Sequence, residues 1–303
     1  MADKKPEASK PPKDAEKAVA KTKATEAKDS PRDPDVPRPP SFWKTLRSDP
    51  PFAIRAALGL GMVLLILLVW WFVTHGDNPV ERTISPSKLP SPGEVLSSRS
   101  GVVDLEDGIY ATLRRVFLGV ALASLVGFTL GVAGSAFRAI GAAIQPIVLF
   151  LRSIPIGALL PIMLALFAVG EKQMVMFLFF AVLAFVTSDT IKAISLVPER
   201  YVETAQTLGA SNFQIIRKVL VPLALPDIIT SLRFQIGLAL GYVMLAEAIG
   251  ADKGLGHMLN LNERLGRIEQ NYLLLFVIVL LALGIDILMR YVQRNLFTWR
   301  RDL

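Results

Sequence analysis

Long uncharged apolar runs dominate the chain after residue 50, and they are longer than the apolar stripes of a soluble helical protein. The first run, residues 56–73, holds eighteen uncharged residues, which is enough for a helix to cross the hydrocarbon core of a bilayer. A segment interrupted by prolines, residues 145–161, shares this apolar character. The other predicted spans lie at residues 116–137, 173–188, 227–250 and 272–285. The pattern therefore predicts an all-α membrane protein with six transmembrane helices.

The first 50 residues have a different composition. They contain 12 Lys or Arg and 9 Asp or Glu, and half of the prolines of the chain fall within residues 1–51. Such a segment cannot bury enough apolar surface to offset the entropy lost on ordering, so we expect it to be disordered. A tether and a dispensable tail are both open roles for it. We expect three regions: a disordered cytoplasmic tail (1–50), a first transmembrane helix with an outer loop (51–108), and a membrane core (109–303).

Basic residues favour one orientation of these spans. Lys44, Arg47 and Arg55 precede the first span, and four arginines close the chain, so the positive-inside rule places both termini in the cytoplasm. This bias accounts for the net charge of +7 and the pI of about 9.7, and we expect no nucleic-acid partner. Arg114 and Arg115, at the start of the second span, are expected to extend to the outer interface.

Residues for catalysis or metal binding are scarce. The chain has no Cys and only two His, His75 and His257, which are far apart in the sequence. It contains no GxxxxGK[ST], HExxH or GxSxG motif, so we expect no catalytic residues, no metal and no cofactor of its own. An intramembrane enzyme and a channel remain the alternatives to a transporter. The first lacks a nucleophile and a base, and the second would be expected to show a filter or a ring of charges.

A charged, amphipathic stretch at residues 198–226 separates two of the predicted spans. A helix can begin after Pro198 and end at Gly209, which readily adopts the left-handed conformation of a helix end. A second short helix can start with Ser211 as N-cap, because Gln214 three residues later completes a capping box. We expect Pro222 and Pro226 to bring the chain back towards the membrane. The stretch thus predicts two short helices hinged at a glycine.

This stretch resembles the EAA loop of the permease subunits of ABC importers. The resemblance rests on Glu203-Thr204-Ala205, Gly209-Ala210 and Val221-Pro222, with Thr204 and Val221 as departures from the usual Ala and Leu. In that family the loop docks into a cleft of the ATP-binding subunit. The resemblance implies a hydrogen-bonding role for Glu203, a turn at Gly209, and further coupling contacts. The residues implied to make those contacts with the ATP-binding subunit are Thr204, Ala205, Leu208, Ala210 and Phe213.

Further motifs resemble the nitrate, sulfonate and taurine branch of these permeases. They are Leu89-Pro90-Ser91-Pro92, Leu151-Arg152-Ser153-Ile154-Pro155, Leu160-Pro161, Gly170-Glu171, residues 246–251 and Gly254-Leu255-Gly256. The resemblance implies a type I importer (MetI-like) permease fold in a bacterial inner membrane, which conducts a small solute of that kind. It also implies two copies of the chain in contact with lipid, a solute-binding protein outside, and a separate subunit that binds ATP.

Polar residues within the spans are the remaining candidates for function. We expect Asp189 to pair with Lys192 rather than to contact substrate. Glu247 should face the bundle interior in a structural role, hydrogen-bonded across helices, and Gln235 is a further pore or structural residue. Asp286 can pair with a residue four positions later, Arg290. Gly127 and Gly131 predict a close helix contact. The bends of the third span could serve a conformational change or be static kinks.

Overall fold

The computed structural model describes residues 49–76, 82 and 84–299. The chain divides into two units, Met1–Ile66 and Leu67–Leu303. In the first unit, the described residues belong mainly to helix α2 (Phe52–Thr74), which continues into the second unit and confirms the first predicted span. The predicted disordered tail lies outside the described residues, except for its last two positions.

The second unit is helical throughout the part that the structure describes, with no strand in it. Four of its helices, and α2, are long and apolar enough to cross a membrane, and the bent pair α5–α6 passes the same test when its two helices are taken together. Five of the six predicted spans are therefore confirmed as single helices, and the third corresponds to this bent pair. The helices are α3 (Pro92–Ser97), α4 (Leu105–Ala136), α5 (Arg138–Ser153), α6 (Ile156–Phe167), α7 (Glu171–Ser195), α8 (Glu199–Thr207), α9 (Asn212–Ile215), α10 (Val221–Gly250), α11 (Leu255–Arg264) and α12 (Ile268–Leu296).

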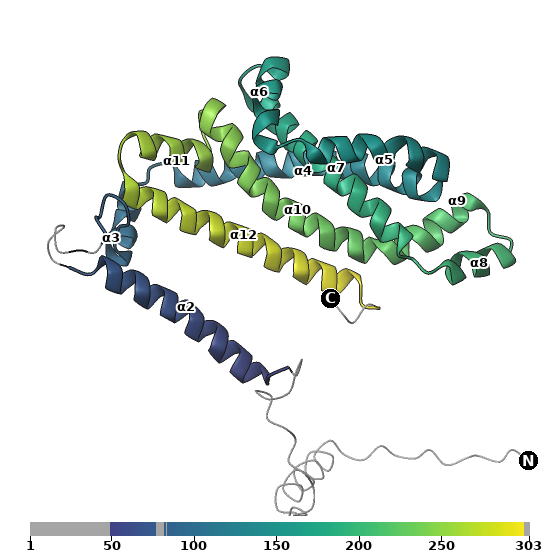
Figure 1. The fold of residues 1–303 in the computed structure, drawn as a ribbon, viewed down its shortest axis with the longest axis horizontal. Coiled ribbons are helices and arrows are strands. Elements are labelled where there is room, and N and C mark those ends of the chain that lie inside the picture. The colour runs from purple at the N-terminus through teal and green to yellow at the C-terminus, as the bar shows by residue number, and fades with distance from the viewer. Residues whose placement is uncertain (1–48, 77–81, 83, 300–303) are drawn as a thin grey trace, which may run out of the picture. The chain divides into compact units, whose positions relative to one another are not determined.

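The core of this unit lies where α4, α7 and α10 pack side by side (Figure 1). Small residues on α4 allow the close approach: a Cβ built on Gly131 would lie only 2.5 Å from the Cβ of Thr190 on α7. A Cβ on Gly127 would likewise lie 3.0 Å from a methyl carbon of Val186. The predicted glycine contact face is thus confirmed, and it brings together large side chains such as Phe177 in the buried core.

The third span is broken. Helices α5 and α6 meet at an angle of 101°, and the break falls at Ile154 and Pro155. Pro155 stands immediately before the first residue of α6, where its missing N–H removes no helical hydrogen bond. Pro146 and Pro161 lie inside α5 and α6 without ending them. Only one of the three prolines therefore marks the break.

The second helix of the 198–226 stretch is not a separate short helix. The chain runs from α9 through a π-helical segment, Ile216–Leu220, into α10, so that Asn212–Gly250 forms one helix of 39 residues. Pro222 and Pro226 lie within this helix and do not end it. A proline inside a helix bends it without ending it when neighbouring helices support the adjacent turns. Pro226 is buried, and its carbonyl accepts hydrogen bonds from Thr230 Oγ1 at 2.9 Å and from Gln293 Nε2 on α12 at 3.0 Å.

Candidate functional site

The turn between α8 and α9 lies at the opposite end of α10 from α11 (Figure 1). Pro198 precedes α8 as its N-cap residue, and the helix ends at Thr207; Gly209, two residues later, has a φ of +77°, the left-handed conformation predicted for it. The Ala210 N–H closes the end by donating to the Ala205 carbonyl at 3.0 Å. Ser211 then caps α9 in the predicted capping box: its own N–H donates to Gln214 Oε1 at 2.9 Å, and its hydroxyl accepts from the Gln214 N–H at 3.4 Å.

Apolar side chains at this turn are exposed. Leu208 is 81% exposed and Phe213 is 69% exposed, and α8 buries none of its residues. Glu203 and Thr204 are also exposed, but the Thr204 hydroxyl is already bonded to the Arg200 carbonyl at 2.6 Å. An exposed Leu and Phe on either side of a tight turn form an apolar surface that is suited to contact another protein.

The turn is joined directly to the interior of the bundle. Because α9, the π-helical segment and α10 are continuous, a displacement at Asn212 is carried along about 58 Å of helix at 1.5 Å per residue. The far end of this rod, near Gly250, packs against α4, α7 and α11. Sequence reasoning predicted the turn but not this connection.

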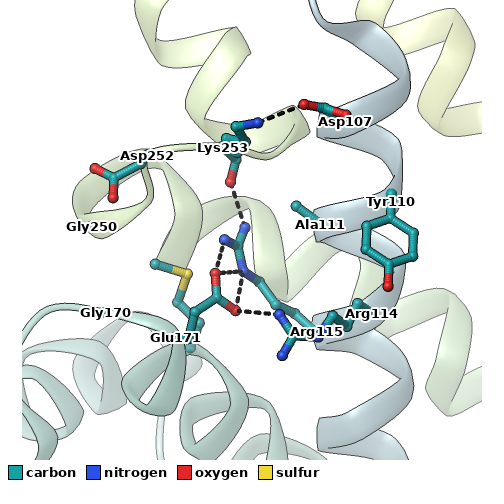
Figure 2. Close-up of a pocket in the computed structure, with 11 residues that line it drawn as sticks. Asp107, Tyr110, Ala111, Arg114, Arg115, Gly170, Glu171, Gly250, Asp252 and Lys253 are labelled. Atoms are coloured by element: carbon teal, nitrogen blue, oxygen red, sulfur yellow. Dashed lines mark hydrogen bonds and ion pairs between the residues drawn. The ribbon is translucent and has the colours of Figure 1, made fainter.

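That far end holds a network of charged side chains around the buried Arg115, and Figure 2 shows its contacts with Glu171 and Lys253. Arg115 on α4 donates to Glu247 Oε1 on α10 at 2.7 Å, and its Nε donates to Glu171 Oε1 on α7 at 3.1 Å, with a second short contact from Nη2 to the same oxygen. The Arg115 side chain is only 3% exposed, so the prediction that it extends to the interface is wrong. Two carboxylates neutralise its charge and allow its burial. Arg114 is 55% exposed, as expected of an interfacial side chain.

The Glu247 carboxylate is fully buried and bonded across helices, as predicted. It accepts hydrogen bonds from Thr112 Oγ1 at 2.9 Å and from the Gly256 N–H at 2.9 Å, in addition to Arg115. Gly254 completes the enclosure: its φ is +137°, and a Cβ there would lie 2.5 Å from Glu247 Cδ and 2.7 Å from Arg115 Nη1. The Gly-Leu-Gly motif is therefore a tight cover over a buried carboxylate.

The other candidate polar residues lie further along α7 and α10. Gln235 Nε2 donates to Asp189 Oδ2 at 3.2 Å, so these two candidates do meet. In the described part of the chain no ion pair joins Asp189 to Lys192, and that prediction is wrong because the carboxylate bonds to α10 instead. The predicted pair of Asp286 with Arg290 is confirmed at 2.8 Å, and Arg233 on α10 adds a second cation at 2.9 Å.

Within residues 49–76, 82 and 84–299, no group of three His, Asp or Glu side chains is placed to hold a metal ion. The fold is a bundle of apolar helices. Buried charged side chains join the helices at one end, and an exposed apolar turn lies at the other end. These features define a polytopic helical membrane protein with an exposed apolar surface at one end.

Comparison with known proteins gives the family. The chain belongs to the family described as binding-protein-dependent transport system inner membrane component, whose profile matches residues 119–301. It is 29% identical to the taurine transport system permease protein TauC of Escherichia coli K12 over 84% of this chain and 93% of that protein. It is 30% identical to the nitrate import permease protein NrtB of Synechocystis over 68% of this chain and 75% of that one.

The fold has a counterpart among solved structures. A chain of the MetNI methionine ABC transporter, in an inward-facing conformation, is 25% identical, with a TM-score of 0.58 over 63% of this chain and 95% of that chain. The predicted permease branch and the MetI-like fold are both confirmed. The protein is thus a permease subunit of an ABC importer, a transport component without an enzymatic role of its own, in which ATP is handled by a partner.

Proposed function

We propose that this chain forms the translocation pathway for nitrate, a sulfonate, taurine or a related small solute, and that residues 198–226 couple it to the ATPase. The relatives that transport taurine and nitrate support the solute class. The observation that carries the coupling role is the exposed apolar turn continuous with α10. The residues assigned to coupling are Glu203, Thr204, Ala205, Leu208, Gly209, Ala210 and Phe213.

The proposal includes an assembly. Two copies of the chain pair in the bacterial inner membrane with lipid around them, both termini face the cytoplasm, and a solute-binding protein delivers substrate on the opposite side. The regional organisation remains as expected from the sequence, with residues 109–303 as the permease core. Asp189, Gln235 and Glu247 serve as structural polar residues within it, because each is hydrogen-bonded to a neighbouring helix.

The mechanism is mechanical. Closure of the ATPase subunits displaces the turn at Gly209, and the continuous helix carries that displacement to the α11 end of the bundle. The permease is then a two-state element whose equilibrium is biased by nucleotide bound elsewhere. Leu208 and Phe213 supply the apolar contacts of the docking surface, and their exposure supports that role.

The test is a substitution at the turn. In proteoliposomes with the ATPase and the binding protein, Gly209→Asp should abolish uptake while leaving the permease in the membrane and ATP hydrolysis measurable. A Cβ at this position meets no neighbour within 4 Å, but φ is +77° and the new charge would face the docking cleft. Gly266→Asp is a matched control, since Gly266 has a φ of +68° and equally open surroundings. Unchanged uptake by the Gly209→Asp variant would contradict the docking assignment.

A second measurement locates the partner. The chain has no Cys, so a single Ala205→Cys substitution gives a thiol without background. We expect it to form cross-links with the ATPase subunit from the cytoplasmic side. Cross-links formed only from the outer side would overturn both the orientation and the coupling role.

A further inference from the structure

Helix α5 carries a line of polar side chains along one face. Arg138, Gln145 and Arg152 are spaced seven residues apart, which places them close to one line along the helix, with about 10 Å between neighbouring members. All three are exposed in the chain. The helix packs against α4 and α7, and it ends at the break in the third span. The line therefore runs from the start of α5 to the break.

A cleft of about 350 Å³ opens beside this line, between α4, α5 and α7. Arg138 and Gln145 line it from α5, and Ser188 lines it from α7. Ser188 also joins the cleft to the third member of the line, because Arg152 Nη1 donates to its hydroxyl oxygen at 2.6 Å. The cleft is lined mainly by small and apolar residues, and four polar side chains lie in it or beside it, which we call the α5 track (Arg138, Gln145, Arg152 and Ser188).

The two arginines of the α5 track lack carboxylate partners. In the described part of the chain, no Asp or Glu pairs with Arg138 or with Arg152. The arginines of the buried networks differ: Arg115 and Arg233 each bond to a carboxylate. Of the five N–H donors of Arg152, one is used by Ser188, and its guanidinium lies 4.8 Å above the ring of Phe185.

The position of Arg152 makes its lack of a carboxylate partner unusual. Ser188 lies about 25 Å along α7 from Glu171 and about 10 Å from Ser195, at 1.5 Å per residue, so the contact lies on the part of this apolar helix nearer to α8. A charge on a membrane-spanning helix is costly unless it faces water, a polar partner or a solute pathway. An unpaired arginine that keeps four donors free therefore indicates an anion at some stage of transport.

We infer that the α5 track binds the anionic group of the transported solute, with Arg152 as its principal contact. A planar guanidinium matches two oxygens of a sulfonate or nitrate, and the hydroxyl proton of Ser188, which its bond to Arg152 does not use, is available to a third oxygen. Gln145 and Arg138 then offer the anion donors along α5. The inference rests on the proposed transport function and names the chemical group that the pathway selects.

The test uses the full chain with its ATPase and binding protein in proteoliposomes, and the probes are nitrate, ethanesulfonate and taurine. For whichever probe the unmodified system imports, Arg152→Gln should lower uptake at least tenfold, and Arg152→Lys should keep at least a third of it. ATP hydrolysis should remain measurable in both. The control is Arg264→Gln, which removes an exposed arginine of α11 and should leave uptake unchanged.

A second pair of variants decides the matter if Arg152→Gln does not assemble. Gln145→Glu places a negative charge on the track, and Gln145→Lys places a positive charge at the same exposed position. We expect the Glu variant to lower anion uptake about tenfold and the Lys variant to keep it. Equal uptake by the two variants, or an Arg152→Gln variant that matches Arg264→Gln, would overturn the inference.

The two levels of the proposal fail in different ways. If the unmodified assembly shows no ATP-dependent uptake of any solute, the proposed function itself is wrong. If it imports neutral or cationic solutes but none of the three probes, the importer stands and the anion site is wrong. Loss of uptake in Gly209→Asp with normal uptake in Arg152→Gln would likewise preserve the coupling role and refute only the α5 track.

Discussion

Removal of Arg115 should be among the most destabilising single substitutions in this protein. Its side chain is 3% exposed, and Glu247, its partner at 2.7 Å, is fully buried. Arg115→Met removes the cation that pairs with Glu247 in the described structure, leaving only the bonds from Thr112 and the Gly256 N–H. Breaking a buried pair by removing one partner costs about 3–5 kcal/mol, because the remaining charge is uncompensated.

Substitution of Glu247 should lower the free energy of unfolding less than substitution of Arg115 does. This difference between the two partners is the sharper test. In Glu247→Gln, Arg115 keeps Glu171, with a contact at 3.1 Å, and the Lys253 carbonyl, at 2.6 Å. Its charge thus remains neutralised, and we expect a loss of about 1–3 kcal/mol, typical of an unsatisfied buried hydrogen-bonding group. Arg115→Met/Glu247→Met removes both charges and should recover most of the loss of the Arg115 variant.

Thermal unfolding of the purified permease in detergent measures these differences. For a unit of this size 1 kcal/mol shifts Tm by about 2–4 °C, so Arg115→Met should lower Tm by roughly 6–20 °C. Arg290→Met is the control, since its pair with Asp286 is 57% and 33% exposed and such pairs contribute about 0–1 kcal/mol. The reasoning is refuted if Arg115→Met melts within 2 °C of the unmodified protein, or if the double variant is less stable than either single one.

Two further outcomes concern the segments that flank the spans. Gly254→Ala should lower Tm at least as much as Glu247→Gln, because its Cβ would overlap the Glu247 carboxylate at 2.5 Å and φ is +137°; an unchanged Tm would contradict this. The hydrogen bond from the Ser91 N–H, together with Arg82, lowers the pKa of the Glu94 carboxyl in the folded protein. The ionised carboxylate therefore stabilises α3 at pH values above the pKa of the unfolded chain, and this stabilisation is lost as the pH falls through the lower pKa of the folded state. Hydrogen exchange of residues 91–98, corrected for intrinsic rates, should therefore accelerate in acid below about pH 4.5, and Glu94→Gln should abolish that dependence.

The features that could be predicted from the sequence are those that a short stretch of neighbouring residues determines. Apolar runs specify the spans, and the capping box of Ser211 with Gln214 needs only a four-residue spacing. Gly209 was predictable because a helix followed at once by a capped helix needs a left-handed turn between them. Each of these depends on local backbone chemistry rather than on the packing of the bundle.

The charge network could not be predicted in the same way. Arg115 lies 56 residues from Glu171 and 132 from Glu247 in the sequence, and only the packing of α4, α7 and α10 brings the three together. From the sequence, the reach of a long basic side chain placed Arg115 at the outer membrane interface, since nothing local indicated two carboxylate partners. The continuity of α9 with α10 was missed for a similar reason, because support from α12 allows the helix to pass through Pro226.

The arrangement of paired and unpaired charges suggests how one displacement could serve the whole pathway. At the α11 end, Arg115 ties α4, α7 and α10 together, so we expect these helices to move as one body when α10 is displaced at its α9 end. Helix α5 has no ion pair to that body in the described structure, and the break at Pro155 separates it from α6. Its only polar side-chain link to α7 there is the bond from Arg152 to Ser188. A solute anion that takes over the donors of Arg152 would loosen that link, so release of α5 and passage of the solute would be the same event. Ser188→Ala should then raise ATP hydrolysis in the absence of solute while lowering the dependence of hydrolysis on the binding protein, and unchanged hydrolysis on both counts would refute the coupling between them.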